Sequence, residues 1–316
     1  MLNAGIICEY NPFHLGHMEH IAATRAKLGE DTGIVCVMSG NFVQRGEPAI
    51  LDKHSRAKMA ILCGADLVLE LPLPWATASA ERFAYGAVSI LNDSGVVSHI
   101  SFGSECGDIE ELSAAAKVIT SDEARGFIFE ELEKGVSYAS ARQKVAEKLM
   151  GDKAILLKDP NNILGVEYIK AIDKLGAKIS PMTIKRVEVY HDGEISGNFA
   201  PASKLRELIY DGNEFADYMP AKAVEVLNEA RENGRCPIDL EAFKELVLFK
   251  LRTMTEREYS ILPDCSEGLW MRIMRLGRVC PSYEELISQV KTKRYALSRI
   301  RRIVLAALLG VTAEDQ

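Results

Sequence analysis

The stretch "AGIICEYNPFHLGHMEHIAATRAKL" (residues 4–28) decides the expected fold of the chain. It opens with "AGIICEY", a short and mostly apolar run that ends in turn residues, which is typical of a buried parallel strand. It closes with "GHMEHIAATRAKL", which has helical spacing and ends near Gly29. A strand that passes directly into a helix is the repeating unit of an α/β protein.

The same alternation continues along the chain. We expect further strands in residues 33–38, 66–72, 96–103 and 178–187. We expect the accompanying helices in residues 52–65, 78–95, 162–177 and 201–212. This order predicts a doubly wound parallel α/β sheet with a Rossmann-like arrangement.

Two departures from the alternation indicate the domain organisation. A charged helical segment at about residues 108–150 is interpreted as an insertion. From about residue 213 onward the pattern is helical throughout. Because 316 residues suit two domains better than one core, we expect an α/β domain over residues 1–212 and a helical, basic domain over residues 213–316.

The composition, with 47% hydrophobic and 26% charged residues, is that of a folded globular protein. The apolar run "IVLAALLGV" (residues 303–311) is too short to span a bilayer, and the first residues do not have a signal-peptide pattern. The seven cysteines are scattered without a CxxC pair, which favours free thiols and argues against a structural zinc site. We therefore expect a cytoplasmic protein that does not bind a membrane.

The segment "KTKRYALSRIRR" (residues 291–302) has six cations and no acid, although the net charge of the whole chain is −7. One interpretation is a solvated helix face, and the other is a patch that binds the phosphate backbone of a nucleic acid. Tyr295 within it could stack on a base, but we expect it to pack in the core.

Three of the six histidines, His14, His17 and His20, lie where the first strand meets the first helix. Ligands of doubly wound sheets bind at the carboxyl ends of the strands, and a helix N-terminus there favours phosphate. Gly16 permits a close approach of the ligand to the backbone, and Pro12 stiffens the turn. His14 and His17 can both donate to phosphate oxygens and stabilise charge on an α-phosphate during nucleotidyl transfer.

Two other interpretations of these histidines are weaker. A metal site needs a third ligand, but His20 lies further round the helix and no cysteine or acid is better placed, so we predict no metal site. A dry core position is also disfavoured, because a turn at a strand end is rarely dry.

The segment "NPFHLGH" (residues 11–17) matches the HxGH signature of the nucleotidyltransferase superfamily, which includes class I aminoacyl-tRNA synthetases. Longer blocks extend the match, and together they resemble the tRNA(Met) cytidine acetate ligase family from the first strand to the last basic helix. The blocks are "GIICEYNPFHLGH", "SGNFVQRGEPAILDKHSRAKMAILCGADLVLELP", "SFGSE", "DPNNILGVEYIKAI", "TIKRVEVYHD" and "KTKRYALSRIRR".

The resemblance implies a ligase that consumes ATP and acetate. Acetate would attack the α-phosphate of ATP to give acetyl-adenylate, and the acetyl group would pass to the wobble cytidine of elongator tRNA(Met), giving N(4)-acetylcytidine. The α/β domain would then be the catalytic domain and the helical domain would bind tRNA. Mg²⁺ is implied by the ATP chemistry. Family members continue for several elements after the corresponding basic helix, and lacking them would weaken or alter tRNA binding.

The resemblance also implies site residues, with His14 and His17 as the catalytic pair on the phosphates. The implied ATP-binding residues are Ile7, Cys8, Glu9, Tyr10, Asn11, Pro12, Phe13, His14, Leu15, Gly16, His17, Met18, Glu19, His20, Gly103, Asn161 or Asn162, and Arg186. Some have simpler explanations. Gly103 could be an ordinary turn glycine, the asparagines could cap the following helix, and Arg186 could be a surface cation.

Three further groups complete the prediction. In "APASKLR" (residues 200–206), the outer phosphates would meet Ser203, Lys204 and Arg206, although family members are richer in Ser and Thr there. The acetate or cytidine pocket would include Asn41, Gln44 and Arg45, with Lys53 and Arg56 near the same cleft. The tRNA-binding cations would be Lys291, Lys293, Arg294, Arg299, Arg301 and Arg302.

Two other functions compete with the acetate ligase. A small-molecule adenylyltransferase of cofactor synthesis would explain the HxGH turn but not the basic helical domain. A non-catalytic module that binds a nucleotide or RNA would explain both without chemistry. A class I synthetase is disfavoured, because no KMSKS-type lysine loop follows the sheet.

Overall fold

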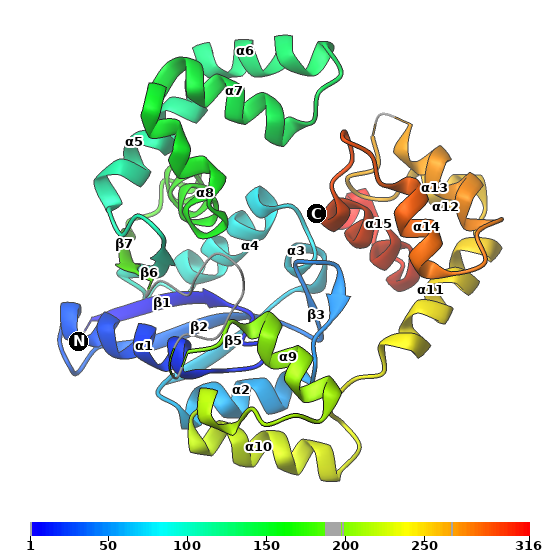
Figure 1. Cartoon of the computed structure of the whole chain (residues 1–316). Helices are drawn as coiled ribbons and strands as arrows, with labels where there is room; N and C mark the ends of the chain where they lie inside the picture. Colours follow the sequence, from blue (N-terminus) through cyan, green and yellow to red (C-terminus); the bar gives the residue numbers. More distant parts are fainter. Residues whose placement is uncertain (1, 187–196, 198, 267) are drawn as a thin grey trace.

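The computed structural model describes residues 2–186, 197, 199–266 and 268–316. Its centre is a parallel sheet of five strands in the order β5-β2-β1-β6-β7 (Figure 1). The strands are β1 Asn3–Cys8, β2 Gly33–Ser39, β5 Leu67–Leu71, β6 His99–Ser104 and β7 Ser180–Lys185. The predicted doubly wound sheet is confirmed, and every predicted strand is present within three residues of its expected bounds. Residues 187–192 lie outside the described residues. They comprise the second part of the "TIKRVEVYHD" block and include residue 187, the last of the predicted strand.

The strand order changes direction between β1 and β6, which are neighbours in the sheet although far apart in the chain. Successive strands add outward on one side as β2 and β5, and on the other as β6 and β7. Because all the strands are parallel, their carboxyl ends share one edge, where Cys8 pairs with Met38 and Ser104 with Lys185. Ligands of such sheets bind at this switch point.

Both faces of the sheet are covered, because side chains of a strand point alternately to its two faces. From β2, Val35 and Val37 join a cluster with helices α4 and α8, whereas Ile34 and Cys36 join one with α2, α9 and α10. Figure 1 shows these two helical layers above and below the sheet. The covering helices are α1 Leu15–Leu28, α2 Lys53–Leu62, α3 Leu73–Ala76, α4 Ala80–Asp93, α8 Pro160–Leu175, α9 Ala202–Asp211 and α10 Ala221–Glu232, with the 3₁₀ helix η2 Ala216–Tyr218 before α10.

The segment expected as an insertion is helical. It contains α5 Ile109–Thr120, α6 Asp122–Glu133 and α7 Tyr138–Met150, and is followed by the 3₁₀ helix η1 Gly151–Lys158. Helix α5 packs on α8, whereas α6 and α7 extend beyond the sheet and share a small apolar cluster that includes Ile128 and Val145 (Figure 1).

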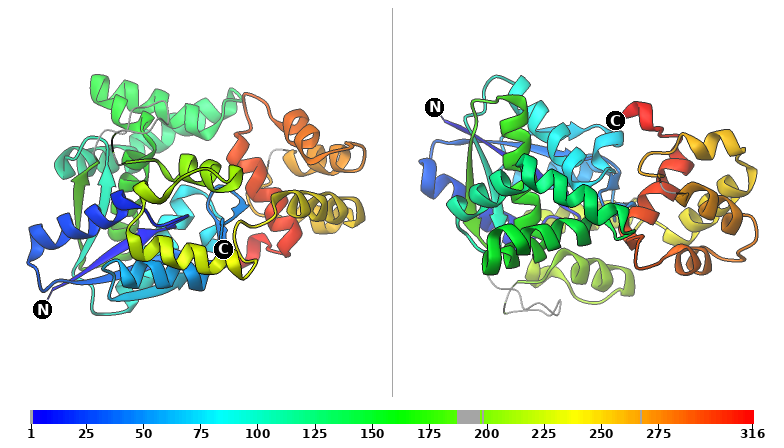
Figure 2. Two further views of the ribbon diagram at one scale, coloured as in Figure 1. Left: turned by 60° about the horizontal axis from the view of Figure 1, so that its bottom comes forward. Right: turned by 90° about the horizontal axis from the view of Figure 1, so that it is seen from above.

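A helical domain at one end of the molecule completes the chain (Figure 2). Its elements are α11 Leu240–Thr253, α12 Glu256–Ser260, α13 Leu269–Gly277, α14 Tyr283–Val290, α15 Leu297–Leu309 and η3 Ala313–Asp315. They enclose a separate apolar cluster, in which Ile300 and Val304 of α15 are fully buried. No helix in the described part of the chain combines the length and the apolar character needed to cross a membrane.

The packing differs from the expected division at residue 213. Helix α10 lies against α2, and its Val226, Leu227 and Ala230 belong to the cluster beneath the sheet. The apolar cluster of the helical domain begins only at Val247. The helical pattern alone does not show which core a helix covers, and α10 covers that of the sheet. We therefore propose that the two domains divide just after Cys236.

A short antiparallel hairpin of the sheet domain, which the sequence did not predict, packs against the helical domain. It consists of β3 Phe42–Val43 and β4 Glu47–Pro48. At its tip, Gly46 has a φ of +78° and lies against α15 so closely that a Cβ atom would be 2.5 Å from the backbone nitrogen of Arg302. Only glycine meets both conditions without strain. The hairpin therefore packs in direct backbone contact with α15, the helix that carries most of the predicted RNA-binding arginines.

Candidate active site

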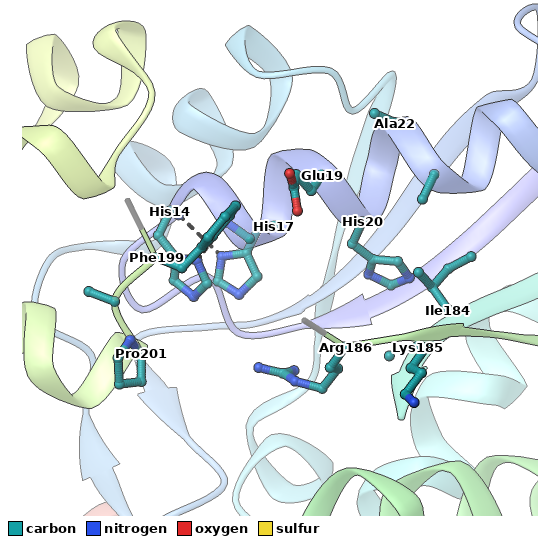
Figure 3. Close-up of a pocket in the computed structure, with 14 residues that line it drawn as sticks. His14, His17, Glu19, His20, Ala22, Ile184, Lys185, Arg186, Phe199 and Pro201 are labelled. Carbon is teal, nitrogen blue, oxygen red and sulfur yellow. Dashed lines mark hydrogen bonds between the residues drawn. The ribbon is translucent and has the colours of Figure 1, made fainter. Parts of the chain in front are cut away.

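A cavity of about 460 Å³ lies at the carboxyl edge of the sheet, beside the turn between β1 and α1 (Figure 3). This volume is within the usual range for small-molecule sites. Among the predicted residues, those that line it are His14, Gly16, His17, Glu19, His20, Gly103 and Arg186. The sequence did not predict the other lining residues, which are Ala22, Ala23, Ile184, Lys185, Phe199, Ala200 and Pro201.

His14 and His17 form a stacked pair at the start of α1. Their ring centroids are 3.7 Å apart and their planes are 26° from parallel. Nδ1 of His14 accepts a hydrogen bond from the backbone nitrogen of Gly16 (3.1 Å), and Nδ1 of His17 accepts one from that of His14 (3.2 Å). These bonds are a reciprocal cap of the helix. They also fix the tautomer, because a neutral imidazole whose Nδ1 accepts carries its proton on Nε2.

Burial keeps both rings neutral. Burial, and secondarily the cation of Arg186, lower the pKa of His14 from 6.5 to about 3. Burial also lowers the pKa of His17 well below 6.5, with smaller contributions from His14 and Arg186. Figure 3 shows the two rings pointing toward the space between Pro201 and Arg186. The pair therefore presents two neutral Nε2–H donors to whatever occupies this part of the cavity.

His20 lines the same cavity but has a different partner. Its Nε2 lies 3.0 Å from Oγ of Ser101, which is also 2.7 Å from Oγ1 of Thr24. Burial lowers the pKa of His20 to about 4. Among the described residues, no group of three or more histidines, cysteines or acids is placed to hold a metal ion.

Other residues of the turn support the pair from behind. The buried ring of Tyr10 makes an edge contact with His17 at a centroid distance of 4.8 Å, and buried Phe13 is 5.5 Å from the same ring. Oδ1 of Asn11 accepts from the backbone nitrogen of Ile50 (2.8 Å). The predicted residues of this run that do not line the cavity are Ile7, Cys8, Glu9, Tyr10, Asn11, Pro12, Phe13, Leu15 and Met18.

Gly103 and Arg186 form the opposite wall. The stem of Arg186 lies across Gly103, where a Cβ atom would be 3.1 Å from Cγ of the arginine. Nη1 of Arg186 donates to Oδ1 of Asn161 (3.3 Å), so this asparagine lies one hydrogen bond behind the wall. Asn162 is 1% exposed and does not line the cavity, because its Oδ1 accepts from the backbone nitrogens of Glu105 and Cys106.

The start of helix α9 reaches the cavity through Phe199, Ala200 and Pro201. Pro201 occupies the cap position and makes no side-chain hydrogen bond to the amides of the first turn, a kind of helix start at which anions bind. The three predicted phosphate residues do not line the cavity. Ser203 is exposed, Nζ of Lys204 pairs with Glu207 (2.7 Å), and Nη1 of Arg206 donates to the backbone oxygen of Asn11 (2.8 Å).

Comparisons with known proteins identify the family of the chain. The model of the HIGH Nucleotidyl Transferase family matches residues 1–316. The tRNA(Met) cytidine acetate ligase of Acetivibrio thermocellus is 42% identical, in an alignment that covers 98% of this chain and 78% of the relative. That of Caldicellulosiruptor saccharolyticus is 43% identical, with 98% and 77% covered. The chain belongs to the tRNA(Met) cytidine acetate ligase family.

A solved structure of this family carries a nucleotide. Thermotoga maritima TmcAL bound with alpha-thio ATP is 38% identical and superposes with a TM-score of 0.93 over 99% of this chain and 76% of that one. The apo form of the same protein superposes with a TM-score of 0.94. The resemblance stated from the sequence blocks is thus confirmed at the level of family and fold.

The loop in which the family resemblance placed the acetate or cytidine pocket lies away from the cavity lining. Oδ1 of Asn41 accepts from the backbone nitrogen of Lys53, and the backbone nitrogen of Gln44 donates to Oε1 of Glu9, both at 2.8 Å. Arg45 is exposed. In this arrangement the loop forms the β3–β4 hairpin and secures the turn below the histidine pair.

Arg56, expected near that cleft, is instead completely buried beneath the turn. It donates to the backbone oxygens of Glu9, Ser39, Gly40 and Leu51. A buried guanidinium that satisfies four carbonyl groups of loops and strand ends is a structural support of the sheet edge.

The basic segment expected to bind tRNA in this family is only partly exposed. Lys291 and Lys293 are exposed, and Arg294 is half-buried. Arg299 donates to the backbone oxygen of Asp264 (2.9 Å), Arg302 pairs with the carboxylate of Asp264 (3.5 Å), and Arg301 pairs with Glu47 of the hairpin (3.5 Å). Tyr295 is buried in the core of the helical domain, as expected.

Proposed function

We propose that the chain is an ATP-dependent acetate ligase that makes acetyl-adenylate and transfers the acetyl group to the wobble cytidine of elongator tRNA(Met), giving N(4)-acetylcytidine. The single observation that carries this proposal is the pair of neutral histidines, held in the Nε2–H form at a helix N-terminus, in a chain of this ligase family. The proposed substrates are ATP, acetate and the tRNA. A tRNA substrate implies a cytoplasmic protein.

In the first step, an acetate oxygen bonds to the α-phosphorus of ATP while the bond from that phosphorus to the bridging oxygen breaks, and pyrophosphate leaves. Negative charge builds on the oxygens of the α-phosphate. Nε2–H groups of His14 and His17 would donate to these oxygens, and Arg186 supplies a full positive charge on the opposite wall. Donors fixed before the reaction stabilise such charge without reorganising.

The predicted nucleotide contacts separate into two layers. We propose direct contacts for the residues that line the cavity, with the ribose or adenine near Gly103 and the outer phosphates at the first turn of α9. Asn161 and the buried part of the turn then hold these groups in place. Ser203 and Lys204 would reach the phosphates only by turning toward them.

The described part of the cavity lining offers Mg²⁺ a single carboxylate ligand. Glu19 is the one carboxylate among the described residues that line the cavity. Mg²⁺ commonly binds through one or two carboxylates together with substrate phosphates and waters. Glu19 would therefore supply the protein ligand, and the bound ion would offset charge on the departing pyrophosphate.

In the second step, the exocyclic amine of the cytidine bonds to the acetyl carbon, the bond from that carbon to the AMP oxygen breaks, and the amine releases a proton. The cytidine must leave its stack to reach the cavity, which a single-stranded anticodon loop permits at low cost. Lys291 and Lys293 are the predicted cations best placed to meet the tRNA backbone, because both side chains are exposed.

Release of pyrophosphate from ATP, measured with and without acetate and with and without elongator tRNA(Met), tests this function. We expect release to require acetate, and we expect mass spectrometry of the digested tRNA to detect N(4)-acetylcytidine. Release that is indifferent to acetate would favour a cofactor adenylyltransferase. ATP binding without any release would favour a non-catalytic module.

A matched pair of variants links the chemistry to the histidines. Asparagine caps helices well, so His14→Asn removes the Nε2–H donor while it preserves the helix start. We expect pyrophosphate release to slow by about 100-fold or more, as when one fixed oxyanion donor is lost. The control, His54→Asn, changes an exposed histidine at the start of α2 and should leave the rate unchanged.

A further inference from the structure

A carboxylate that the sequence analysis did not single out lies behind the cavity wall. Glu105 follows β6 directly, and its side chain reaches the first turn of α8. Oε1 accepts from the backbone nitrogen of Asn161 (3.3 Å) and from its Nδ2 (2.6 Å), and Oε2 accepts from the backbone nitrogen of Asn162 (2.8 Å). The carboxylate thus caps a helix whose own cap residue, Asp159, makes no side-chain hydrogen bond to the backbone N–H groups of the first turn.

The connection is reciprocal. Oδ1 of Asn162 accepts from the backbone nitrogens of Glu105 (3.0 Å) and Cys106 (3.2 Å), and its Nδ2 donates to Asp159 (3.3 Å). The loop after β6 and the start of α8 therefore hold each other through five hydrogen bonds between Glu105, Cys106 and the two asparagines. Asn162 is almost completely buried within this network.

The same network determines which way the side-chain amide of Asn161 faces. Because Glu105 can only accept, it binds the Nδ2 end of the amide and leaves the Oδ1 end for Arg186. Nη1 of Arg186 donates to that oxygen at 3.3 Å. With the amide reversed, an NH₂ group would face the guanidinium and an oxygen would face the carboxylate, and both contacts would be lost.

Arg186 is the residue whose position depends on this arrangement. It lines the cavity opposite the histidine pair, and its charge contributes to the low pKa of His14 and His17. Its stem lies in the space that Gly103 leaves free. A long cationic side chain has many rotamers, so a fixed acceptor behind it reduces the entropy lost when a phosphate binds.

We propose that Glu105 is a positioning residue for ATP, acting through Asn161 to hold the Arg186 guanidinium against the cavity. This rests on the proposed function in one respect, namely that the anion that Arg186 meets is ATP. Glu105 itself does not line the cavity.

Titration calorimetry with ATP alone tests the proposal, using the full chain and the substitution Glu105→Gln. Glutamine keeps one acceptor but places an NH₂ group against either Nδ2 of Asn161 or the backbone N–H of Asn162. We expect the Kd for ATP to rise about tenfold, the factor expected when one charge-assisted hydrogen bond is lost. Glu110→Gln, at an exposed acid in the first turn of α5, is the matched control and should leave the Kd unchanged.

A double-mutant cycle separates positioning from a general loss of structure. If Glu105 acts through Arg186, then Glu105→Gln should change the Kd by less than about twofold in a chain that already carries Arg186→Gln. An equal effect in both backgrounds would overturn the proposal, as would an unchanged Kd in the single variant. Because this readout needs neither acetate nor tRNA, a parent protein that binds ATP but forms no acetyl-adenylate would refute the proposed function and leave this test intact.

Discussion

Lowering the pH from 7.5 to 5.5 tests how the surroundings of the cavity histidines, one buried and two half-buried, contribute to stability without any substitution. The pKa of His20 is lowered by burial from 6.5 to about 4, and that of His14 to about 3. At pH 5.5 these side chains are protonated in the unfolded chain but remain neutral in the folded one. A group whose folded pKa is lowered stabilises the fold above its unfolded pKa, and this stability is lost as the pH falls below it.

The magnitude follows from the distance to the unfolded pKa. At pH 5.5, one unit below 6.5 and still above the folded pKa of His20, the lost stability is about 1.4 kcal/mol per histidine. His14 should contribute the same amount, and His17 acts in the same direction. The free energy of unfolding therefore decreases through each of them over this pH range.

Urea denaturation at the two pH values isolates one of these contributions. Glutamine at position 20 can still meet Oγ of Ser101 but does not titrate. The loss of unfolding free energy between pH 7.5 and 5.5 should thus be smaller by about 1.4 kcal/mol in His20→Gln than in the parent. His54→Gln, at an exposed position, is the matched control. A His20→Gln variant with the pH dependence of the parent would refute the argument from burial.

Three other perturbations test separate parts of the structure. Gly103→Ala places a Cβ atom 3.1 Å from Cγ of Arg186. We therefore expect the affinity for ATP, measured by calorimetric titration, to fall by about a factor of 5. An unchanged affinity would show that this wall of the cavity is not in contact with the nucleotide. Arg56→Met removes the donor to four backbone oxygens, and we expect it to lower the free energy of unfolding, measured in urea, by about 4 kcal/mol. Lys58→Met, on the exposed face of the same helix, should lower it by less than about 0.5 kcal/mol. Similar losses in the two variants would contradict the structural role of Arg56. Replacing Lys291 and Lys293 together with glutamine should reduce the slope of log affinity for tRNA against log salt by about 1.5 in a filter-binding assay, and an unaltered slope would remove these two lysines from the RNA surface.

The parallel sheet was predictable because its information is local. Each strand is a short apolar run, each helix has its own spacing, and their alternation admits few topologies. The HxGH turn was predictable for the same reason, since His14, Gly16 and His17 are neighbours in the chain and in space. The β3–β4 hairpin was not, because its two-residue strands are too short for a pattern and are held by Glu9 and α15.

The rest of the site depends on contacts between distant segments. Lys185, Phe199 and Pro201 line the cavity because β7 ends and α9 begins beside the turn that follows β1, which no local pattern shows. Glu105 was missed because its role appears only once α8 is placed against the loop after β6. The arginines of α15 were predicted by charge alone, and charge does not reveal that Arg301 is already paired with a glutamate 254 positions earlier in the chain, at residue 47.

The close packing of Gly46 on α15 affects whether either domain can be exchanged for that of another protein. The hairpin has the turn below the histidines on one side, through Gln44 and Glu9, and the helical domain on the other, through Gly46 and Arg302. A sheet domain produced alone would lose the surface against which this hairpin rests, and a foreign helical domain would have to reproduce a backbone-to-backbone fit. An exchange of domains, in evolution or by engineering, would therefore have to replace the hairpin and α15 together.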